Sequence, residues 1–477
     1  IMDGKTGDSL IKSMYSDGTL REPSDILKTL KEFTLSARES SFRETLTLHN
    51  IRFLTDYFQQ CVEALTSQQV FNVECCTECL RCLRNACAQC VENQEAVLRS
   101  LAIPAVRQLL RYLVETVSLE EQYLVLLRCC IQFLTNLASG HEAGQRAVWK
   151  DIIHDLIHPL LCVPDGKLTQ YSCMLLQTVL QCSDNIISFA ETVDASESME
   201  AVLAACSEES EHDFCLQLVK LILQSSTITS SLFDKLSISS QILLLYIASA
   251  CISSESREQH PEANNTISDS TLSCFAQKFK STAHCILALA MKDRDEEDQN
   301  PQLVMSLLEV LCAASAETDL QPFLQDMDFV LETSLGLLDM VEQVGRSSDN
   351  AFSVRQDGAG TGDDASLAAE PGYGFKRNLV QLIGNMCFRH RGNQDRVREL
   401  KGIPTILQQC NIDSKNAFIN QWAILAIRNL CENNLENQAF LLSLKSQGVA
   451  DNAALGRLGY EAALREDGQI YLKNLKK

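Results

Sequence analysis

Six cysteines form the densest group of side chains in the chain that could bind a metal: Cys75, Cys76, Cys79, Cys82, Cys87 and Cys90. Three of them follow C-x2-C-x2-C, a spacing at which thiolates hold an iron–sulfur cluster, but the usual fourth ligand stands four residues on and precedes proline. Here Cys87 is five residues on and Ala88 follows it. Zinc fails as well, because the pairs Cys79/Cys82 and Cys87/Cys90 are separated by four residues rather than a dozen or more. We therefore expect small buried side chains of a helix, with no metal and no cofactor.

Other residue patterns that could support catalysis are incomplete. His154 and His158 form an i, i+4 pair, but they lack the Glu of H-E-x-x-H and a third ligand. Gly358, Gly360 and Gly362 alternate within a Gly-, Ser- and Asp-rich segment, with no strand before them and no helix opening at the last. No Ser or Cys stands in a recognised catalytic motif with a positioned base. The sequence therefore predicts that the protein is not an enzyme.

A spaced polar motif occurs four times and is more specific than any of these groups. In each copy an Asn closes an apolar run, and a polar pair follows eight and nine residues later. The four Asn are Asn85, Asn136, Asn385 and Asn429, and the pairs are Asn93-Gln94, Gly144-Gln145, Asn393-Gln394 and Asn437-Gln438. Neighbouring copies are 51 residues (85 to 136) and 44 residues (385 to 429) apart, close to the period of solenoids built from two or three helices per repeat. The motif predicts stacked helical repeats.

Two roles are open for the four Asn. Equivalent positions of stacked repeats form a ladder, and a ladder of amides can bracket the backbone of an extended peptide. Alternatively, each Asn ties its turn to the neighbouring repeat, and both roles can coexist. Arg84 and Arg428 precede the Asn in two copies and would add positive charge beside a groove. The candidate partner-binding residues are Asn85, Asn136, Asn385, Asn429, Arg84 and Arg428.

Bulk composition agrees with packed helices. The 477 residues exceed what one globular core supports, and the chain is 45% apolar with 6% aromatic residues, 20 Gly and 9 Pro. The net charge of −21 disfavours nucleic acid, because phosphates are bound mainly by Lys and Arg, and makes basic partners more plausible. An odd count of 21 Cys and a polar start without a signal peptide predict reduced thiols in the cytosol. The longest apolar run, 242–252, is about half of the ~20 residues that cross a membrane.

Five segments follow from these patterns. We expect an N-terminal helical cap over 1–70, repeats with the motif over 71–165, and divergent helical repeats over 166–344. Residues 345–374, rich in Gly, Ser, Asp and Ala, predict a flexible linker. Residues 375–477 hold the two clearest copies and a tail in which 469–472 is either a short strand or a last helical turn.

The Asn-bearing helices resemble the armadillo repeat, whose third helix ends in an apolar-x-Asn-Leu stretch and whose next unit starts with Gly-Ile-Pro. Here these features read Ala426-Ile427-Arg428-Asn429-Leu430 and Gly402-Ile403-Pro404. Residues 375–475 further resemble the C-terminal domain of the ataxin-10 family, through 382–385, 393–395, 402–404, 411–413, 426–430, 432–434 and 437–438. The stretch 79–87 resembles the same family. The resemblance implies an all-α, armadillo-like α-solenoid of stacked helical repeats.

The same resemblance implies a cytoplasmic adaptor and brings no catalytic residues. It links the protein to neuron survival and neurite outgrowth through Ras and MAP kinase signalling, and to cytokinesis. It implies a perinuclear location, centrosomes or basal bodies and the midbody, and partners that include the G protein β subunit and O-linked N-acetylglucosamine transferase, as well as homo-oligomers.

The alternative function is an armadillo-type transport receptor that binds extended basic peptides. In such receptors a Trp stands four residues before the Asn. Here those positions hold Arg81, Gln132, Gln381 and Leu425, which disfavours this function.

Overall fold

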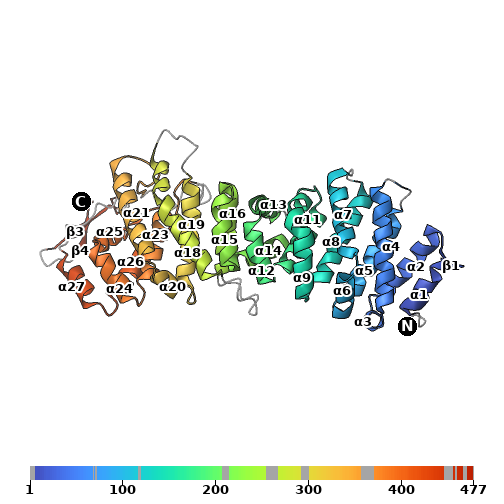
Figure 1. The fold of residues 1–477 in the computed structure, drawn as a ribbon. Helices are drawn as coiled ribbons and strands as arrows, with labels where there is room; N and C mark the ends of the chain where they lie inside the picture. Colours follow the sequence, from blue (N-terminus) through green and yellow to red (C-terminus); the bar gives the residue numbers. More distant parts are fainter. Residues whose placement is uncertain are drawn as a thin grey trace. The chain divides into compact units, whose positions relative to one another are not determined.

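The computed structural model describes residues 6–67, 69, 72–116, 120–206, 214–253, 267–291, 300–355, 370–444, 455–456, 459–465 and 470–475. It consists almost entirely of helices (Figure 1). The chain divides into two compact units, Ile1–Leu244 and Leu245–Lys477, and the division falls inside helix α16 (Ile238–Ile252). The described part holds no helix that is both long enough and apolar enough to cross a membrane.

The first unit begins with a short helix and a two-stranded turn and continues as helices only. Its elements are α1 (Gly7–Ser13), β1 (Tyr15–Ser16), β2 (Thr19–Leu20), α2 (Pro23–Ser36), α3 (Ser40–Arg43), α4 (Leu48–Thr66), α5 (Val73–Cys87), α6 (Val91–Leu98), α7 (Ala102–Thr116), α8 (Glu121–Ala138), α9 (Glu142–Val148), the π-helix η1 (Trp149–Ile153), α10 (His154–Leu161), α11 (Gly166–Val179), α12 (Ser183–Glu191), α13 (Ala195–Cys206), α14 (Phe214–Gln224), α15 (Ser226–Leu232) and the 3-10 helix η2 (Phe233–Lys235).

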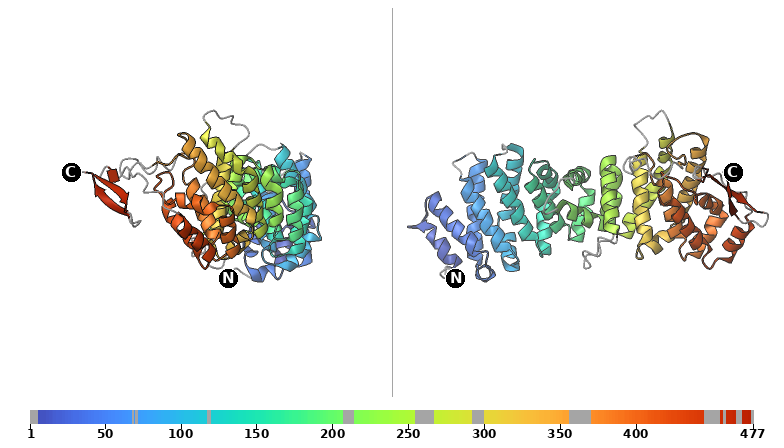
Figure 2. Two further views of the ribbon diagram at one scale, coloured as in Figure 1. Left: turned by 90° about the vertical axis from the view of Figure 1, so that its left-hand side faces the viewer. Right: turned by 180° about the vertical axis from the view of Figure 1, so that it is seen from behind.

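The second unit contains helices and a C-terminal hairpin. Its elements are α18 (Asp269–Thr282), the 3-10 helix η3 (Ala283–Ala290), α19 (Pro301–Ala316), α20 (Gln321–Gln325), α21 (Asp328–Ser347), α23 (Phe375–Met386), α24 (Arg391–Glu399), α25 (Gly402–Gln408), α26 (Ile419–Cys431), α27 (Leu435–Ser443), β3 (Tyr460–Leu464) and β4 (Ile470–Asn474). The strands β3 and β4 form a two-stranded hairpin (Figure 2). They pair antiparallel, with Ala462 opposite Leu472. Of the two alternatives for the tail, the strand is therefore the one observed.

The repeating unit is a triplet of helices whose first helix, called the short helix below, is shorter than its third. In the first unit the triplets are α3–α4–α5, α6–α7–α8, α9–η1/α10–α11 and α12–α13–α14. Their third helices pack in succession, α5 on α8, α8 on α11 and α11 on α14, and the second helices do likewise. In the second unit α20–α21–α23 and α24–α25–α26 are triplets, and α19, α23 and α26 pack in the same succession. This is the stacking of an α-solenoid.

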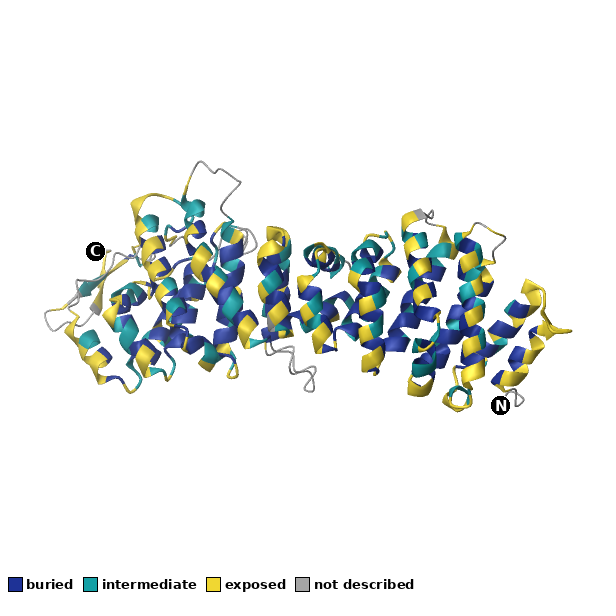
Figure 3. Cartoon of the chain, viewed as in Figure 1, coloured by how far each residue is buried: buried dark blue, intermediate teal, exposed yellow. Residues whose placement is uncertain are grey.

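Apolar spacing explains which helix faces are buried. In α5 the Asn72 side chain accepts the N–H of Cys75 and starts the helix. From there Cys76, Cys79 and Leu83, at i, i+3 and i+7, are buried against neighbouring helices. Figure 3 shows the same division along both units, with buried residues on the faces between helices and exposed ones on the outer faces. The 21 cysteines, which all lie within the described ranges, are thiols and form no disulfide.

The expected flexible linker is partly packed. Helix α21 continues to Ser347, and Phe352 is buried beside the ring of Phe375, with ring centroids 6.2 Å apart. The buried Lys415 donates from Nζ to the carbonyls of Asn350 and Ala351, at 3.1 and 3.2 Å. The composition of 345–374 did not predict these contacts, because only a few residues of this mostly polar segment make them. Residues 356–369 of the predicted linker lie outside the described residues.

Within the segment predicted to hold divergent helical repeats, residues 269–290 form two helices of different type rather than one. Helix α18 ends at Thr282, and the 3-10 helix η3 follows at Ala283. The Thr282 hydroxyl donates to the carbonyl of Lys278 at 2.7 Å, four residues back. Such back-bonding competes with the regular ladder and often bends a helix.

Candidate functional site

The spaced motif has a backbone feature that its side chains do not reveal. Four residues after each Asn, the chain adopts a left-handed conformation, at Gln89, Gly140, Arg389 and Asn433, with φ of 53°, 66°, 53° and 53°. This residue lies in the turn after the third helix of a triplet, and the next residue is the N-cap of the following short helix. The turn has the same length in all four copies, and it therefore fixes the offset of eight and nine residues to the polar pair.

Each of the four motif Asn donates from its side-chain nitrogen to the preceding element of the stack. The distances from Nδ2 are 2.9 Å from Asn85 to Thr34 O, 2.9 Å from Asn136 to Arg84 O, 3.0 Å from Asn385 to Ser315 Oγ and 2.9 Å from Asn429 to Gly384 O. In two cases the acceptor is the residue just before the Asn of the previous repeat. The amide nitrogens therefore connect successive third helices.

The short-helix Asn at offset eight makes two bonds. Asn93 donates to Ala86 O at 2.9 Å and Arg43 O at 3.1 Å, Asn393 to Met386 O at 2.9 Å and Gln325 O at 3.0 Å, and Asn437 to Leu430 O at 2.8 Å and Gln394 O at 3.1 Å. In each case one acceptor is the carbonyl of the residue directly after the third-helix Asn of the same copy. The other acceptor lies in the preceding short helix. Each such Asn therefore joins the end of a third helix to the neighbouring short helix.

The Gln at offset nine extends the network forward. Gln94 donates from Nε2 to Asn136 O at 2.7 Å and Ser139 O at 3.0 Å, and Gln394 donates to Asn429 O at 2.9 Å. We call the third-helix Asn together with these short-helix Asn and Gln the amide clamp. Each of its hydrogen bonds contributes about 0.5–1.5 kcal/mol net.

Diverged copies of the clamp occur where the sequence pattern is unreadable. Asn185 donates to Val179 O at 2.8 Å and to Gln145 O at 3.2 Å, but over six residues rather than seven. The Thr229 hydroxyl reaches Ile222 O at 3.1 Å and takes the place of the amide. At Gly144 the backbone approaches so closely that a Cβ would stand 2.4 Å from Leu137 O. The shorter turn before Asn185 and the replacement of an amide by Thr229 hid two of these copies, whereas the copy with Gly144 was visible in the sequence through Asn136 and Gln145.

The residues predicted to contact a partner differ in exposure. Asn85 and Asn429 are buried, Asn136 and Asn385 are half-buried, and Arg428 is exposed. Arg84 donates from Nε to Asn85 Oδ1 at 3.0 Å and from Nη1 to Gln132 Oε1 at 2.6 Å. Within the described part of the chain, Arg428 has no side-chain hydrogen bond or ion pair.

The structure brings these candidates together in two separate places. Arg84, Asn85 and Asn136 lie on the neighbouring helices α5 and α8, and Asn385, Asn429 and Arg428 lie on α23 and α26. The hydrogen bonds match the role of a tie between repeats. Partner contact stays a prediction.

The six clustered cysteines are packing residues of α5 and the turn after it. All six are buried, and burial raises the pKa of the Cys79 and Cys87 thiols. Cys79 donates to Leu54 O at 3.2 Å, and Cys82 to Leu30 O at 3.3 Å. In the described ranges no group of three His, Cys, Asp or Glu is placed to hold a metal ion.

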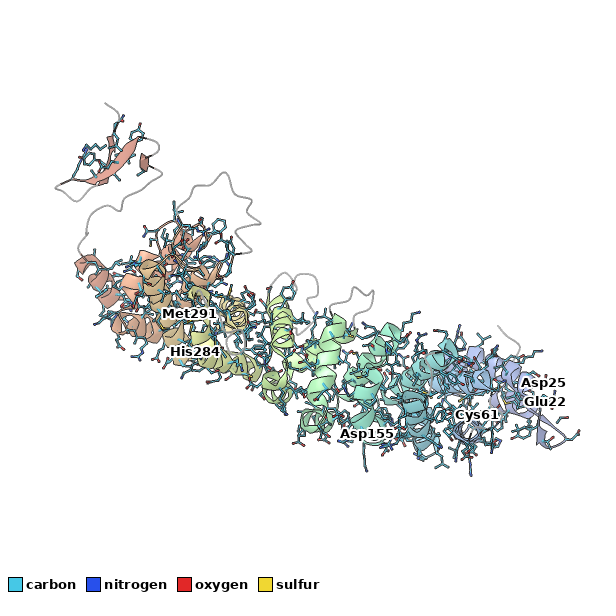
Figure 4. The ribbon with its side chains drawn as sticks, turned by 90° about the horizontal axis from the view of Figure 1, so that it is seen from above. Glu22, Asp25, Cys61, Asp155, His284 and Met291 are labelled. Atoms are coloured by element: carbon cyan, nitrogen blue, oxygen red, sulfur yellow. The ribbon has the colours of Figure 1, made fainter. Side chains whose placement is uncertain are left out.

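His154 is the first residue of α10, and His158 lies one turn later in the same helix. Between them lies Asp155, which is labelled in Figure 4. Asp155 pairs with two arginines of α7: Arg107 Nη2 lies 2.6 Å from its Oδ2, and Arg111 binds the same oxygen. This carboxylate joins two second helices of adjacent triplets. It therefore has a structural role in the stack.

Comparison with known proteins decides the family. The family model described as "Spinocerebellar ataxia type 10 protein domain" matches residues 375–473. Ataxin-10 of Pongo abelii is 32% identical over 473 residues, which cover 95% of each chain, and ataxin-10 of Homo sapiens is 32% identical over 469 residues with the same coverage. The chain belongs to the ataxin-10 family.

Other members of the ataxin-10 family match over a shorter range. The ataxin-10 homolog of Dictyostelium discoideum is 49% identical over 104 residues, which are 22% of this chain and 17% of that protein. Among solved structures, an engineered protein aligns with 89% of this chain and 98% of its own at a TM-score of 0.37 and 13% identity, a likeness too low to carry an argument. The predicted family and the predicted all-α repeat fold are both confirmed.

Proposed function

We propose that this member of the ataxin-10 family is a non-enzymatic scaffold that binds protein partners along its third helices. One observation carries the proposal: the amide groups of the third-helix Asn are divided between two tasks. Their nitrogens connect the repeats, while in the described part of the chain the Oδ1 atoms of Asn136, Asn385 and Asn429 accept no hydrogen bond. None of these oxygens is a buried unsatisfied atom, so water or a partner can reach them.

Helix spacing suits an extended peptide. Packed helices stand about 8–10 Å apart, close to the length of three extended residues at about 3.3 Å each. Successive Asn oxygens can therefore accept N–H groups from a peptide that runs across the third helices. Arg428 lies beside Asn429 with its guanidinium exposed, and Arg84 lies beside Asn85. These arginines would bind carboxylates or carbonyls of the same partner.

Family membership supports the identity of the first partners to test. They are the G protein β subunit and O-linked N-acetylglucosamine transferase, and the cellular roles we propose are neuron survival, neurite outgrowth and cytokinesis in the cytoplasm. Homo-oligomers belong to the same proposal.

Biolayer interferometry tests this proposal by measuring the binding of the two purified partners to the full chain. We expect Arg428→Glu to weaken at least one complex about tenfold or more, because a charge contact at an interface centre contributes that much. Arg52→Glu is the matched control, since Arg52 is exposed and its ion pair, with Asp56, lies within its own helix. Circular dichroism confirms that each variant is folded. Wild-type affinity of Arg84→Glu and Arg428→Glu for both partners, or binding of neither partner by the wild type, would refute this assignment.

A further inference from the structure

The last triplet leaves uncovered the helix faces on which the next triplet would stack. In α23, Val380 and Gly384 are buried where α26 packs, and an added Cβ at Gly384 would stand 3.0 Å from Ala426 Cβ. Forty-four residues later, the equivalent positions in α26 are Ile424 and Arg428. Both are exposed, and Ile424 retains 62% of its accessible surface.

The short helix α27 shows the same contrast with α24. In α24, Arg391 donates to Asn433 O at 3.1 Å, and Arg398 binds Asn437 Oδ1, so both arginines face the next repeat. The equivalent residues of α27 are Leu435 and Leu442, at 74% and 87% exposure. Leucine therefore stands where the previous repeat has arginine, on the side that faces along the stack.

We call the exposed apolar residues Ile424, Leu435 and Leu442 the end face. Solenoids usually close with a capping element whose outer side is polar, because an open end exposes apolar surface to water. A group of large exposed apolar residues on one surface marks a contact site. The end face therefore requires a cover.

The C-terminal hairpin also has an exposed apolar side. Tyr460, Ala462 and Leu472 share one side of β3–β4, and Leu472 is 58% exposed. The opposite side is polar: Glu461 pairs with Lys473 at 3.9 Å, and Arg465 lies over the Tyr471 ring at 5.2 Å. A lone two-stranded hairpin is marginally stable in water at best. Its apolar side therefore also needs a partner.

We propose that the β3–β4 hairpin covers the end face of the same chain and caps the helical stack. Leu444 and Tyr460 are joined by 15 residues, 445–459, which span up to about 50 Å when extended. A tether of this length holds the hairpin at an effective concentration near the millimolar range, above that of a free partner or a second copy. The family model that matches 375–473 also includes α23–α27 and the hairpin in one domain. Docked in this way, the hairpin turns its Glu461 and Lys473 side to water.

Hydrogen exchange of the full chain, read by mass spectrometry under reducing conditions, tests the cap. Leu472→Asp is expected to speed exchange in α26 and α27 about tenfold or more, since burial of one leucine stabilises by at least that factor. Tyr471→Asp, on the other side of the same strand, is the matched control and should leave α26 and α27 unchanged. Reciprocally, Ile424→Asp should speed exchange in β3 and β4. Ile187→Asp, at an exposed isoleucine of the first unit, should not.

Two results would overturn the proposal. One is equal exchange of α26 and α27 in the wild type, Leu472→Asp and Tyr471→Asp. The other is an effect of Leu472→Asp that appears only at concentrations where light scattering gives the mass of a dimer, which would mean that the hairpin covers a second copy.

Discussion

Replacing Asn429 with alanine tests the amide clamp at the most buried of its third-helix Asn. Asn429 is 4% exposed, and its Nδ2 donates to Gly384 O at 2.9 Å. The alanine variant leaves that carbonyl without its side-chain donor at a largely buried position. A lost buried partner costs about 1–3 kcal/mol, so we expect a loss of that size in the opening free energy of α23 and α26. Replacing the half-buried Asn136 with alanine should lower the opening free energy less, by about 0.5–1.5 kcal/mol, because water can take the place of its amide.

Native-state hydrogen exchange of the full chain measures this loss locally, which suits a repeat protein because its stability is not a single two-state quantity. The expected loss corresponds to roughly five- to 150-fold faster exchange in both helices. Gln421→Ala, at an exposed position of α26, is the control and should lie within about 0.5 kcal/mol of the wild type. If Asn429→Ala changes exchange no more than this control, the clamp does not hold the repeats together.

Three further outcomes follow from packing, charge and burial. Gly402→Ala should destabilise the second unit by about 1–3 kcal/mol in urea denaturation, because its Cβ would stand 2.7 Å from a leucine side chain, whereas Gly336→Ala, with open space around it, should stabilise α21 by about 0.5–1 kcal/mol. Burial alone would raise the pKa of Asp395, but hydrogen bonds from two arginines and an asparagine outweigh it and lower the pKa to about 2. The ionised Asp395 therefore stabilises the fold above about pH 4, and this contribution is lost as the pH falls towards 2. In Asp395→Asn the urea midpoint should depend less on pH between these values than in the wild type. In the native protein iodoacetamide should modify the exposed Cys162 within minutes and leave Cys387 unmodified, since burial excludes the reagent and raises the pKa of the Cys387 thiol; equal labelling by mass spectrometry would contradict the packing.

The sequence predicted the fold wherever a repeat kept the full motif. Asn85, Asn385 and Asn429 were visible because each lies at the end of an apolar run, with a turn of fixed length before the next polar pair. The turn depends on one left-handed residue, and its identity varies from Gln to Gly, Arg and Asn, so no residue pattern marks it. The middle repeats were hidden because Asn185 follows a turn one residue shorter and Thr229 replaces an amide.

The site was less predictable than the fold. A single Asn can tie a repeat with its nitrogen and offer its oxygen to a partner, and spacing does not distinguish these uses. The open end face could not be found from apolar spacing either, since Ile424 and Val380 fit the same helical pattern. They differ only in whether a following helix covers them.

The most direct test of the clamp is hydrogen exchange in Gln394→Ala. From one short helix, this side chain donates to Cys387 O after α23, at 3.2 Å, and to Asn429 O in α26, at 2.9 Å. A clamp that couples successive third helices predicts faster exchange at the C-terminal turns of both α23 and α26. A change confined to α24, where Gln394 itself lies, would contradict it.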